Sequence, residues 1–381
     1  MTEEGEGTAG ACWKQSLDIA QSFGDGYWRE QADQREFPRE LWRALGEAGL
    51  LGVLVPKQFG GREGSARHLV AVAESLASAG LPLLTLITGP GLALPVIARH
   101  AAASLRDELL PRLLRGESVV AFAITEGNAG TNLFNLTTRL IPVGDGYKLS
   151  GTKNYTSAAN VADAIVVVAR TAGVSRDEFS LVLLPTDAPG FSCELDDTQV
   201  PLPERQCTLR FDDIAINNDQ LLGRAGEGLR VLAPALVTER LVSAALSCGI
   251  GQYALNKGVA RARKREVFAA PLGRHQAVQH ALARAAIELR AAQLLLQDAC
   301  TIADTAARAD GAANMACYAA GQAGFAAVDA ALQVQGGMGY TRSSGLTMYH
   351  QLARLLRSAP VHAESALNAV GEMVLGLPRS Y

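Results

Sequence analysis

The chain has 381 residues, of which 48% are apolar, and it carries 35 Lys and Arg against 38 Asp and Glu. A chain of this length can bury a large core, and length alone allows two or three structural units. Its nearly neutral charge provides no field that would attract a polyanion, so we expect no nucleic-acid partner.

Targeting and metal signals are absent from the sequence. The first 13 residues, MTEEGEGTAGACW, are acidic and lack an apolar run, so we expect neither a secretory signal nor a transit peptide. Charges break the apolar stretches well short of ~20 residues, so we expect no membrane span. The six cysteines and six histidines show no metal-ligand spacing, which predicts no metal site, reduced thiols and a cytoplasmic protein.

The residue pattern of the chain changes twice along its length. Helical spacing dominates residues 1–118, whereas 119–222 contain short β-branched or leucine runs separated by Gly, Pro and Asp. Residues 223–381 are rich in Ala, Leu and Arg, with long periodic segments typical of a helical bundle. The order of helices, strands and helices predicts an α+β protein with these three domains. The clearest predicted strands are 165–168, 181–184 and 209–214.

The most informative segment is 121–157, AFAITEGNAGTNLFNLTTRLIPVGDGYKLSGTKNYTS. Residues 121–124 are typical of a buried strand and 125–132 of a polar loop, and Asp145-Gly146 predicts a hairpin turn before a strand at 147–151. Hydroxyl groups and one aromatic ring therefore gather at strand ends, in Thr125, Thr131, Tyr155, Thr156 and Ser157. This pattern predicts a flat cofactor held by main chain and small hydroxyl groups.

Two stretches approach nucleotide motifs but fail on spacing. Gly146 to Lys153 is close to a P-loop, yet Thr and Lys are inverted and the run has the pattern of a strand. Gly336 to Gly339 lacks the preceding strand and the acidic ribose partner of a Rossmann turn. Neither stretch supports binding of a nucleoside triphosphate or of nicotinamide.

The segment 121–157 resembles the middle domain of the acyl-CoA dehydrogenase family, which has a TEP-x-AGS-D loop followed by a G-x-K-x-[WY]-[IT]-[ST] strand. Three further segments are similar to family blocks and follow in family order. These are 37–61 (FPRELWRALGEAGLLGVLVPKQFGG), 265–276 (REVFAAPLGRHQ) and 333–340 (QVQGGMGY). The resemblance implies an N-terminal helical domain, a middle β-barrel-like domain, a C-terminal four-helix bundle, bound FAD, and a homodimer or homotetramer.

The resemblance also implies roles for residues of the middle domain. Thr125 and Thr131 take positions that lie against the isoalloxazine and the acyl thioester. Tyr155 takes the place of the ring packed on the flavin, and Ser157 that of a hydroxyl that reaches it. The alternative for each Thr or Ser is an ordinary residue of a strand or turn.

A second group of residues matches the part of the family site that holds the adenosine diphosphate half of FAD. Arg265 and Phe268 match residues that reach this half from the neighbouring subunit, and Gln333, Gly336 and Gly337 match the opposite wall. Arginine offers a fork of donors to a pyrophosphate, and glycine lets the backbone approach it. A solvated helix face around Arg265 and a plain helix C-cap at Gly336 remain the alternatives.

The catalytic base departs from the commonest family pattern. Many members carry it as Glu in an R-D-A-x-x-x-x-I-x-E-G-T block, but the equivalent QLARLLRSAPVH places Pro360 there. The branch that is similar to isovaleryl-CoA and long-chain dehydrogenases has the glutamate in an E-R-L block, which this chain matches at Glu239, Arg240 and Leu241. The resemblance therefore implies Glu239 as base and Arg240 at the substrate, with Glu364 in reserve.

Helical spacing supports this interpretation of Glu239. It follows Leu236 by three residues and Leu232 by seven, which points its side chain along an apolar stripe. A carboxylate there would be desolvated, and its pKa would rise. A solvated helix glutamate is the alternative.

The implied reaction is FAD-dependent dehydrogenation of a short or medium acyl thioester, on CoA or on acyl carrier protein, to an enoyl thioester. Glu239 would take the proton, flavin N5 the hydride, and an electron-transfer flavoprotein would reoxidise the flavin. Pro360 has no N–H for an oxyanion site, so the C–C bond that is oxidised stays open. The alternatives are a flavin-dependent monooxygenase on the same fold and a non-catalytic subunit of a mixed dehydrogenase.

Overall fold

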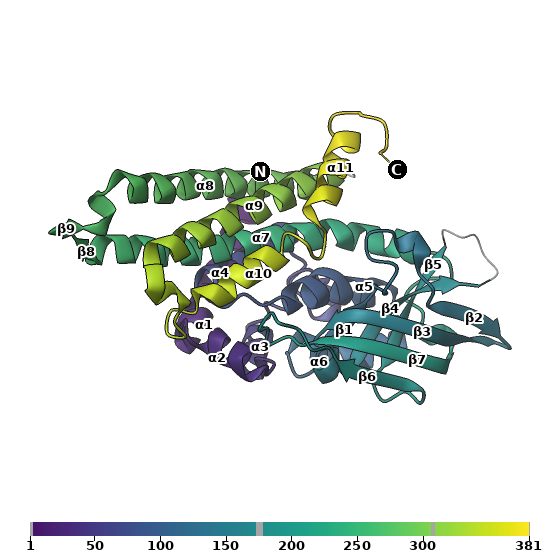
Figure 1. Ribbon diagram of the computed structural model, residues 1–381. Helices are drawn as coiled ribbons and strands as arrows, with labels where there is room; N and C mark the ends of the chain where they lie inside the picture. Colours follow the sequence, from purple (N-terminus) through teal and green to yellow (C-terminus); the bar gives the residue numbers. More distant parts are fainter. Residues whose placement is uncertain (1–2, 173–177, 306–308, 381) are drawn as a thin grey trace. The chain divides into compact units, whose positions relative to one another are not determined.

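The computed structural model describes residues 3–172, 178–305 and 309–380 (Figure 1). The chain forms two compact units. One unit contains Met1–Glu30, Ala66–Leu83 and Arg240–Tyr381, and the other contains Gln31–Ser65 and Leu84–Glu239. The helices α2 (Tyr27–Gln34) and α7 (Gly228–Lys264) each begin in one unit and end in the other.

The first unit, which we call the helical unit, is built on three long helices. These are α7 from Arg240 onward, α8 (Gln276–Thr305) and α9 (Asp310–Gln335). Shorter elements complete it: α1 (Glu3–Phe23), α4 (Ala66–Ser78), β8 (Glu266–Val267), β9 (Ala270–Pro271), η6 (Leu272–Arg274), η7 (Gly336–Tyr340), α10 (Leu346–Leu355) and α11 (Ala363–Met373).

Small residues allow these long helices to approach closely. A Cβ on Gly324 of α9 would lie 2.3 Å from the carbonyl oxygen of Ser247 on α7, and a Cβ on Gly251 would lie 2.9 Å from Gly324 Cα. On α8, leucine and alanine alternate every three or four residues along the buried face, at Leu282, Ala285, Leu289, Ala292, Leu296 and Ala299. The Ala-rich composition after residue 223 is therefore the composition of a tightly packed helical core.

The second unit, which we call the sheet unit, contains a seven-stranded sheet with the order β1-β4-β2-β3-β7-β6, and β5 pairs with β4. The strands are β1 (Val120–Ala123), β2 (Arg139–Val143), β3 (Gly146–Ser157), β4 (Ala164–Thr171), β5 (Phe179–Pro185), β6 (Phe191–Leu195) and β7 (Gln206–Ile216). Its helices are α3 (Arg39–Glu47), α5 (Leu94–His100) and α6 (Ala103–Leu114), with a π-helix η2 (Ile87–Ala93) and short 3-10 turns η1 (Lys57–Phe59), η3 (Leu133–Asn135), η4 (Ala159–Val161) and η5 (Asn218–Gln220).

The predicted strands at 165–168, 181–184 and 209–214 are confirmed as parts of β4, β5 and β7. The predicted hairpin turn is wrong by one residue, because Val143 pairs with Gly146 and the two loop residues are Gly144 and Asp145. Gly144 has φ +59°, which fits a type II′ turn with glycine at its first central position. The near-P-loop stretch Gly146 to Lys153 lies within β3, as expected.

Among the described residues, one helix is long and apolar enough to cross a membrane by length and composition. It is α7, and 61% of its most apolar window is buried inside the protein, as in a core helix. The six cysteines form no disulfide in the part of the chain that the structure describes.

Candidate functional site

A β-bulge in β3 decides which way Tyr155 points. Lys153 pairs with Leu209 of β7 and Thr156 with Cys207, so three steps on β3 oppose two on β7. Strict alternation would place Tyr155 on the same buried face as Lys153, but the bulge leaves Lys153 and Thr156 buried and turns Tyr155 outward. Tyr155 has φ +55° and is 65% exposed. An aromatic ring held outward on a strained backbone is typical of a binding surface.

A buried ion pair joins the polar loop of residues 125–132 to this strand. Lys153 Nζ donates to Glu126 Oε1 at 2.9 Å and to the Ile124 carbonyl at 2.8 Å. Glu126 also accepts from the backbone N–H groups of Thr137 and Thr138, at 2.6 and 2.9 Å. The pair therefore joins the start of the loop to β3 and to the backbone at Thr137 and Thr138.

The pKa values of the pair follow from burial and mutual attraction. Burial alone would raise the pKa of Glu126, but the charge of Lys153 and the hydrogen bonds from Thr137 and Thr138 lower it to about 2. Burial lowers the pKa of Lys153 to about 8, against the opposing effect of Glu126. Both groups are charged at neutral pH, so the ion pair clamps the loop to β3 there. The sequence analysis did not predict this ion pair. Its two signals in the sequence are an acidic residue shortly after β1, Glu126, and a lysine at an inward position of an alternating strand, Lys153.

The predicted hydroxyl groups lie around this clamp in the sheet unit. The Thr125 carbonyl accepts from the N–H of Asn154 at 2.9 Å, so the loop and β3 are also joined next to Tyr155. Thr131 is exposed within the loop. Ser157 contacts Gln206 of β7, with Gln206 Nε2 donating to Ser157 Oγ at 2.9 Å. The structure thus places Thr125, Tyr155 and Ser157 along one strand end.

The proposed base lies on α7. Glu239 is half-buried, one turn beyond Leu236, while Leu232 is fully buried. In the helical unit, Arg240 Nε donates to Asn314 Oδ1 of α9 at 3.2 Å. Asn314 is a buried amide in an Ala-rich helix, and its Nδ2 donates to the Asp310 carbonyl at 2.8 Å. Arg240 is therefore held from a second helix.

The reserve candidate has a different environment. The side chain of Glu364 is 79% exposed and lies 3.3 Å from His362 Nδ1. Its own backbone N–H and then His362 hold the pKa of Glu364 below its ordinary value, which makes it a weaker proton acceptor.

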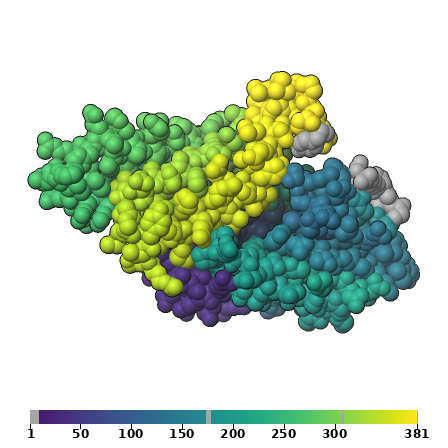
Figure 2. Space-filling view, viewed as in Figure 1, coloured from purple at the N-terminus to yellow at the C-terminus, as the bar shows by residue number. Residues whose placement is uncertain are grey.

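The predicted adenosine-binding residues are all exposed. Val267 pairs with Ala270, so Phe268 and Ala269 form a two-residue hairpin turn with φ +52° and +57°. Phe268 is 91% exposed at its tip, and Arg265 at its base is also exposed. This hairpin lies where α7 ends and α8 begins, in green in the space-filling view (Figures 1 and 2). A strained turn that presents a bare aromatic ring is suited to contact with another molecule.

The opposite wall of the predicted adenosine site lies at the end of α9. Gly336 is the C-cap of that helix with φ +59°, so the helix-cap reading of this glycine is correct. A Cβ at Gly336 or Gly337 would meet open space, which leaves the backbone approachable from outside. Gln333 is exposed on the last turn. The cap and a binding role are therefore compatible.

Comparisons with known proteins agree with this arrangement. Models of the acyl-CoA dehydrogenase N-terminal, middle and C-terminal domains match residues 18–117, 121–214 and 226–372. The chain is 36% identical over 364 residues to the acyl-CoA dehydrogenase FadE12 of Mycobacterium tuberculosis, covering 94% of each chain. Its fold is similar to that of butyryl-CoA dehydrogenase from Megasphaera elsdenii, with a TM-score of 0.90 at 22% identity and 98% and 99% coverage.

A glutaryl-CoA dehydrogenase from Mycobacterium smegmatis, solved in complex with FADH2, has the same fold, with a TM-score of 0.91 at 22% identity and 100% and 96% coverage. The predicted α+β fold, with an N-terminal helical domain, a half-barrel β domain and a C-terminal helical domain, is confirmed. The chain belongs to the acyl-CoA dehydrogenase family, whose members are FAD-dependent oxidoreductases acting on CH–CH groups.

Proposed function

We propose that this enzyme dehydrogenates a short or medium acyl thioester, carried on CoA or on acyl carrier protein, to the enoyl thioester. Similarity to a curated acyl-CoA dehydrogenase over 94% of both chains supports the thioester class. The observation that carries the proposal is the half-buried Glu239 beside an arginine that Asn314 holds in place.

The residues of the sheet unit fit FAD. Tyr155 offers an exposed ring, and Ser157 and the Thr125–Asn132 loop bring hydroxyl and backbone groups to the same strand end. Thr125, Thr131, Tyr155 and Ser157 would hold the isoalloxazine there, with Thr131 and Arg240 also at the thioester. When bound, FAD supplies the acceptor, at N5, for the hydride that leaves the β-carbon.

Glu239 serves as the base that removes the α-proton. It is half-buried on α7, whereas Glu364 is exposed and has a lowered pKa, which makes Glu364 the weaker proton acceptor. Pro360 has no side-chain base and no backbone N–H, so it neither takes the proton nor donates to the thioester carbonyl.

The adenosine half of FAD requires a second copy of the chain in this proposal. Arg265 and Phe268 extend away from their own helical unit, and Gln333, Gly336 and Gly337 are open to solvent. Further exposed apolar side chains accompany them, at Ile287 and Leu294 on α8 and at Met338 and Tyr340 on η7. Exposed apolar surface of this kind marks an interface, which supports a homodimer or homotetramer. An electron-transfer flavoprotein reoxidises the enzyme, and the cytoplasm is its proposed location.

The test compares Glu239→Gln with Glu364→Gln in anaerobic mixing with acyl thioesters on both carriers. Glu239→Gln keeps size and hydrogen bonding, so FAD content stays the same while flavin bleaching slows by ~10²–10⁴. Glu364→Gln is the matched control and retains the parental rate. A parental rate in Glu239→Gln would contradict the assignment, and turnover that needs O₂ and no thioester would favour the monooxygenase alternative.

A further inference from the structure

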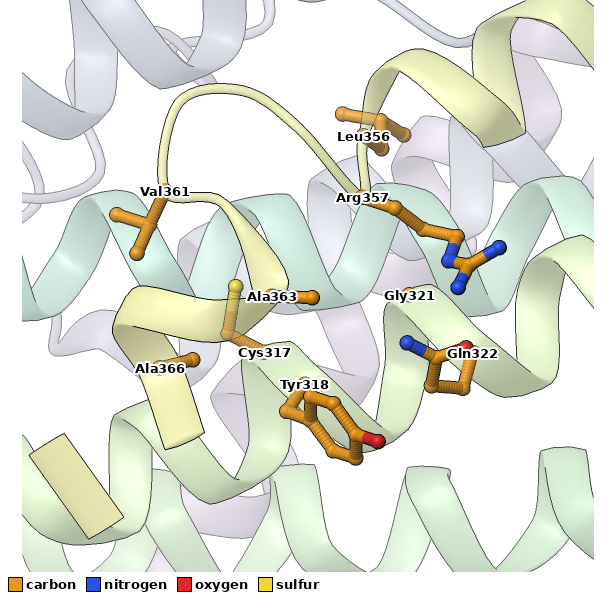
Figure 3. Close-up of a pocket in the computed structure, with 9 residues that line it drawn as sticks. All are labelled: Cys317, Tyr318, Gly321, Gln322, Leu356, Arg357, Val361, Ala363 and Ala366. Atoms are coloured by element: carbon orange, nitrogen blue, oxygen red, sulfur yellow. The ribbon is translucent and has the colours of Figure 1, made fainter. Parts of the chain in front are cut away.

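The helical unit contains a pocket between α9, the end of α10 and the start of α11, whose lining includes Tyr318, Leu356 and Val361 (Figure 3). Its space is about 10 Å³, which is room for roughly one water molecule. The pocket therefore fits water and no organic ligand. The strand ends of the sheet unit, in contrast, carry a set of polar contacts next to the proposed flavin wall.

Gln206 is the cross-strand neighbour of Ser157. It is the first residue of β7, Ser157 is the last residue of β3, and the two are paired in the register of the sheet. Gln206 Nε2 donates to Ser157 Oγ at 2.9 Å, and Ser157 Oγ lies 3.2 Å from Gln206 Oε1. Both residues are half-buried. The glutamine side chain therefore holds the Ser157 oxygen from the neighbouring strand.

The Glu204 carbonyl fixes the direction in which the Gln206 amide faces. This carbonyl lies 3.2 Å from Gln206 Nε2, and a carbonyl can only accept, so the amide nitrogen must be on this side. The second N–H of the amide is then available for Ser157. Glu204 is itself fully buried, and the N–H and hydroxyl of Thr85 donate to its carboxyl group at 3.3 and 3.2 Å. The amide is thus oriented by a residue that is anchored in the core.

This orientation makes the Ser157 hydroxyl available as a donor. A serine oxygen can accept one hydrogen bond and donate another, and here the accepted one comes from Gln206 Nε2. The contact from Ser157 Oγ to Gln206 Oε1 is the longer of the two, so the hydroxyl hydrogen can exchange it for an acceptor on a flavin ring. An N–H that donates to a hydroxyl also strengthens the hydrogen bond that the hydroxyl donates onward.

The backbone around this pair is held without the glutamine side chain. The Ala158 N–H donates to the Arg205 carbonyl at 2.8 Å, and the Asp196 N–H donates to the Gln206 carbonyl at 2.9 Å. A change of the Gln206 side chain should therefore leave both strand ends in place and alter only the hydroxyl of Ser157.

We propose that Gln206 is a positioning residue for FAD, which orients the Ser157 hydroxyl so that it donates to the isoalloxazine. This inference rests on the proposed function, because it takes Ser157 as part of the flavin wall. Gln206 acts through Ser157 and does not itself touch the cofactor. Removal of the amide should therefore affect bound FAD as removal of the hydroxyl does, and removal of both should have no further effect.

The test is a double-mutant cycle of Gln206→Leu and Ser157→Ala. Equilibrium dialysis gives the FAD affinity of each variant, and the visible absorption spectrum of bound FAD is the second readout. Each single variant should weaken FAD binding about fivefold, the size of one neutral hydrogen bond, and both should shift the flavin absorption maximum by the same amount. The double variant should bind FAD as Ser157→Ala does, whereas independent effects would multiply to about 25-fold.

Gln220→Leu is the matched control. Gln220 lies in the sheet unit just after the other end of β7, in η5, where its Oε1 accepts from the Asn217 N–H at 3.0 Å. This variant should leave FAD affinity and the flavin spectrum unchanged. If Gln206→Leu lowers the thermal midpoint of the apoprotein, Gln206→Met takes its place, because methionine keeps the unbranched chain and lacks the amide.

Two results would overturn the inference, and they differ in their consequence for the proposed function. If Gln206→Leu leaves FAD affinity unchanged while Ser157→Ala lowers it, or if the two effects multiply, Gln206 does not act through Ser157 and the flavin wall stands. If Ser157→Ala leaves both FAD affinity and the flavin spectrum unchanged, the hydroxyl does not contact the ring, and the proposed placement of the isoalloxazine at Ser157 fails as well.

Discussion

The two regions assigned to FAD differ in how their own chain supports them. One is the loop 125–132 with β3, and the other is the hairpin around Phe268. In the sheet unit, the loop 125–132 and β3 are joined by a buried ion pair, and Tyr155 and Thr131 are exposed beside it. In the helical unit, Phe268 and Arg265 extend into solvent without a clamp of this kind. A region with its own buried network is held within one chain, whereas the Phe268 ring is 91% exposed and has only the edge of His275 beside it in the described part of its own chain. The comparison predicts that changes in the first region affect folding and changes in the second affect FAD retention.

The largest expected effect comes from breaking the clamp. Lys153→Met leaves Glu126 buried and unpaired, which should lower the free energy of unfolding by roughly 3–5 kcal/mol. The control is Lys148→Met on the same strand, because the Lys148–Asp213 pair is about half exposed and should cost roughly 0–1 kcal/mol. Urea unfolding gives the free energy of unfolding of both variants. Equal values would show that the buried pair stabilises the fold no more than the exposed pair does.

The pH dependence of stability tests a second buried group of the sheet unit. Glu204 is fully buried, and Thr85 N–H and Oγ1 donate to it at 3.3 and 3.2 Å. Burial raises its pKa from 4.5 to about 7, against the hydrogen bonds that lower it. The folded state therefore binds more protons than the unfolded state between pH 4.5 and 7, so this group makes stability fall as pH rises through that window.

Replacing Glu204 with Gln should remove this loss, so that the variant gains up to roughly 3 kcal/mol relative to the parent between pH 5 and 8. Glu194→Gln, whose side chain is 74% exposed, is the control and should leave the pH profile unchanged. The test compares the unfolding midpoints of the parent and of both variants at pH 5 and at pH 8. An unchanged pH slope in Glu204→Gln would contradict the assigned pKa.

The smallest expected effect concerns the hairpin. Arg265→Ala should weaken FAD binding by roughly 1.5–3 kcal/mol, the value of a hydrogen bond to a charged group, while the unfolding midpoint of the apoprotein stays unchanged. Arg263→Ala, another exposed arginine two residues earlier, should retain FAD like the parent. Equilibrium dialysis of FAD against both variants measures the two affinities. An equal loss of FAD affinity in the two variants would show that Arg265 contributes only positive charge and no specific contact.

The order of helices and strands could be predicted from the sequence because each element depends on a local pattern of residues. Apolar runs such as 165–168 are read directly from periodicity, and the family motifs fixed the candidate residues. The bulge at Asn154 and Tyr155 was out of reach, because it depends on how β3 registers with β7 more than fifty residues later. The Glu126–Lys153 clamp escaped for a similar reason: both residues are normally exposed, and only the fold buries them.

The central claim is that one chain supplies the flavin wall and another supplies the hairpin. The most direct measurement co-expresses Tyr155→Asp and Arg265→Glu with different tags, purifies the mixed oligomer through both tags, and counts bound FAD. Each variant alone should lose FAD. In a mixed dimer the account predicts about one intact site in two, since the wall of one chain meets the hairpin of the other. A mixed oligomer that holds as little FAD as its parents would contradict the account, because both regions would then serve the same chain.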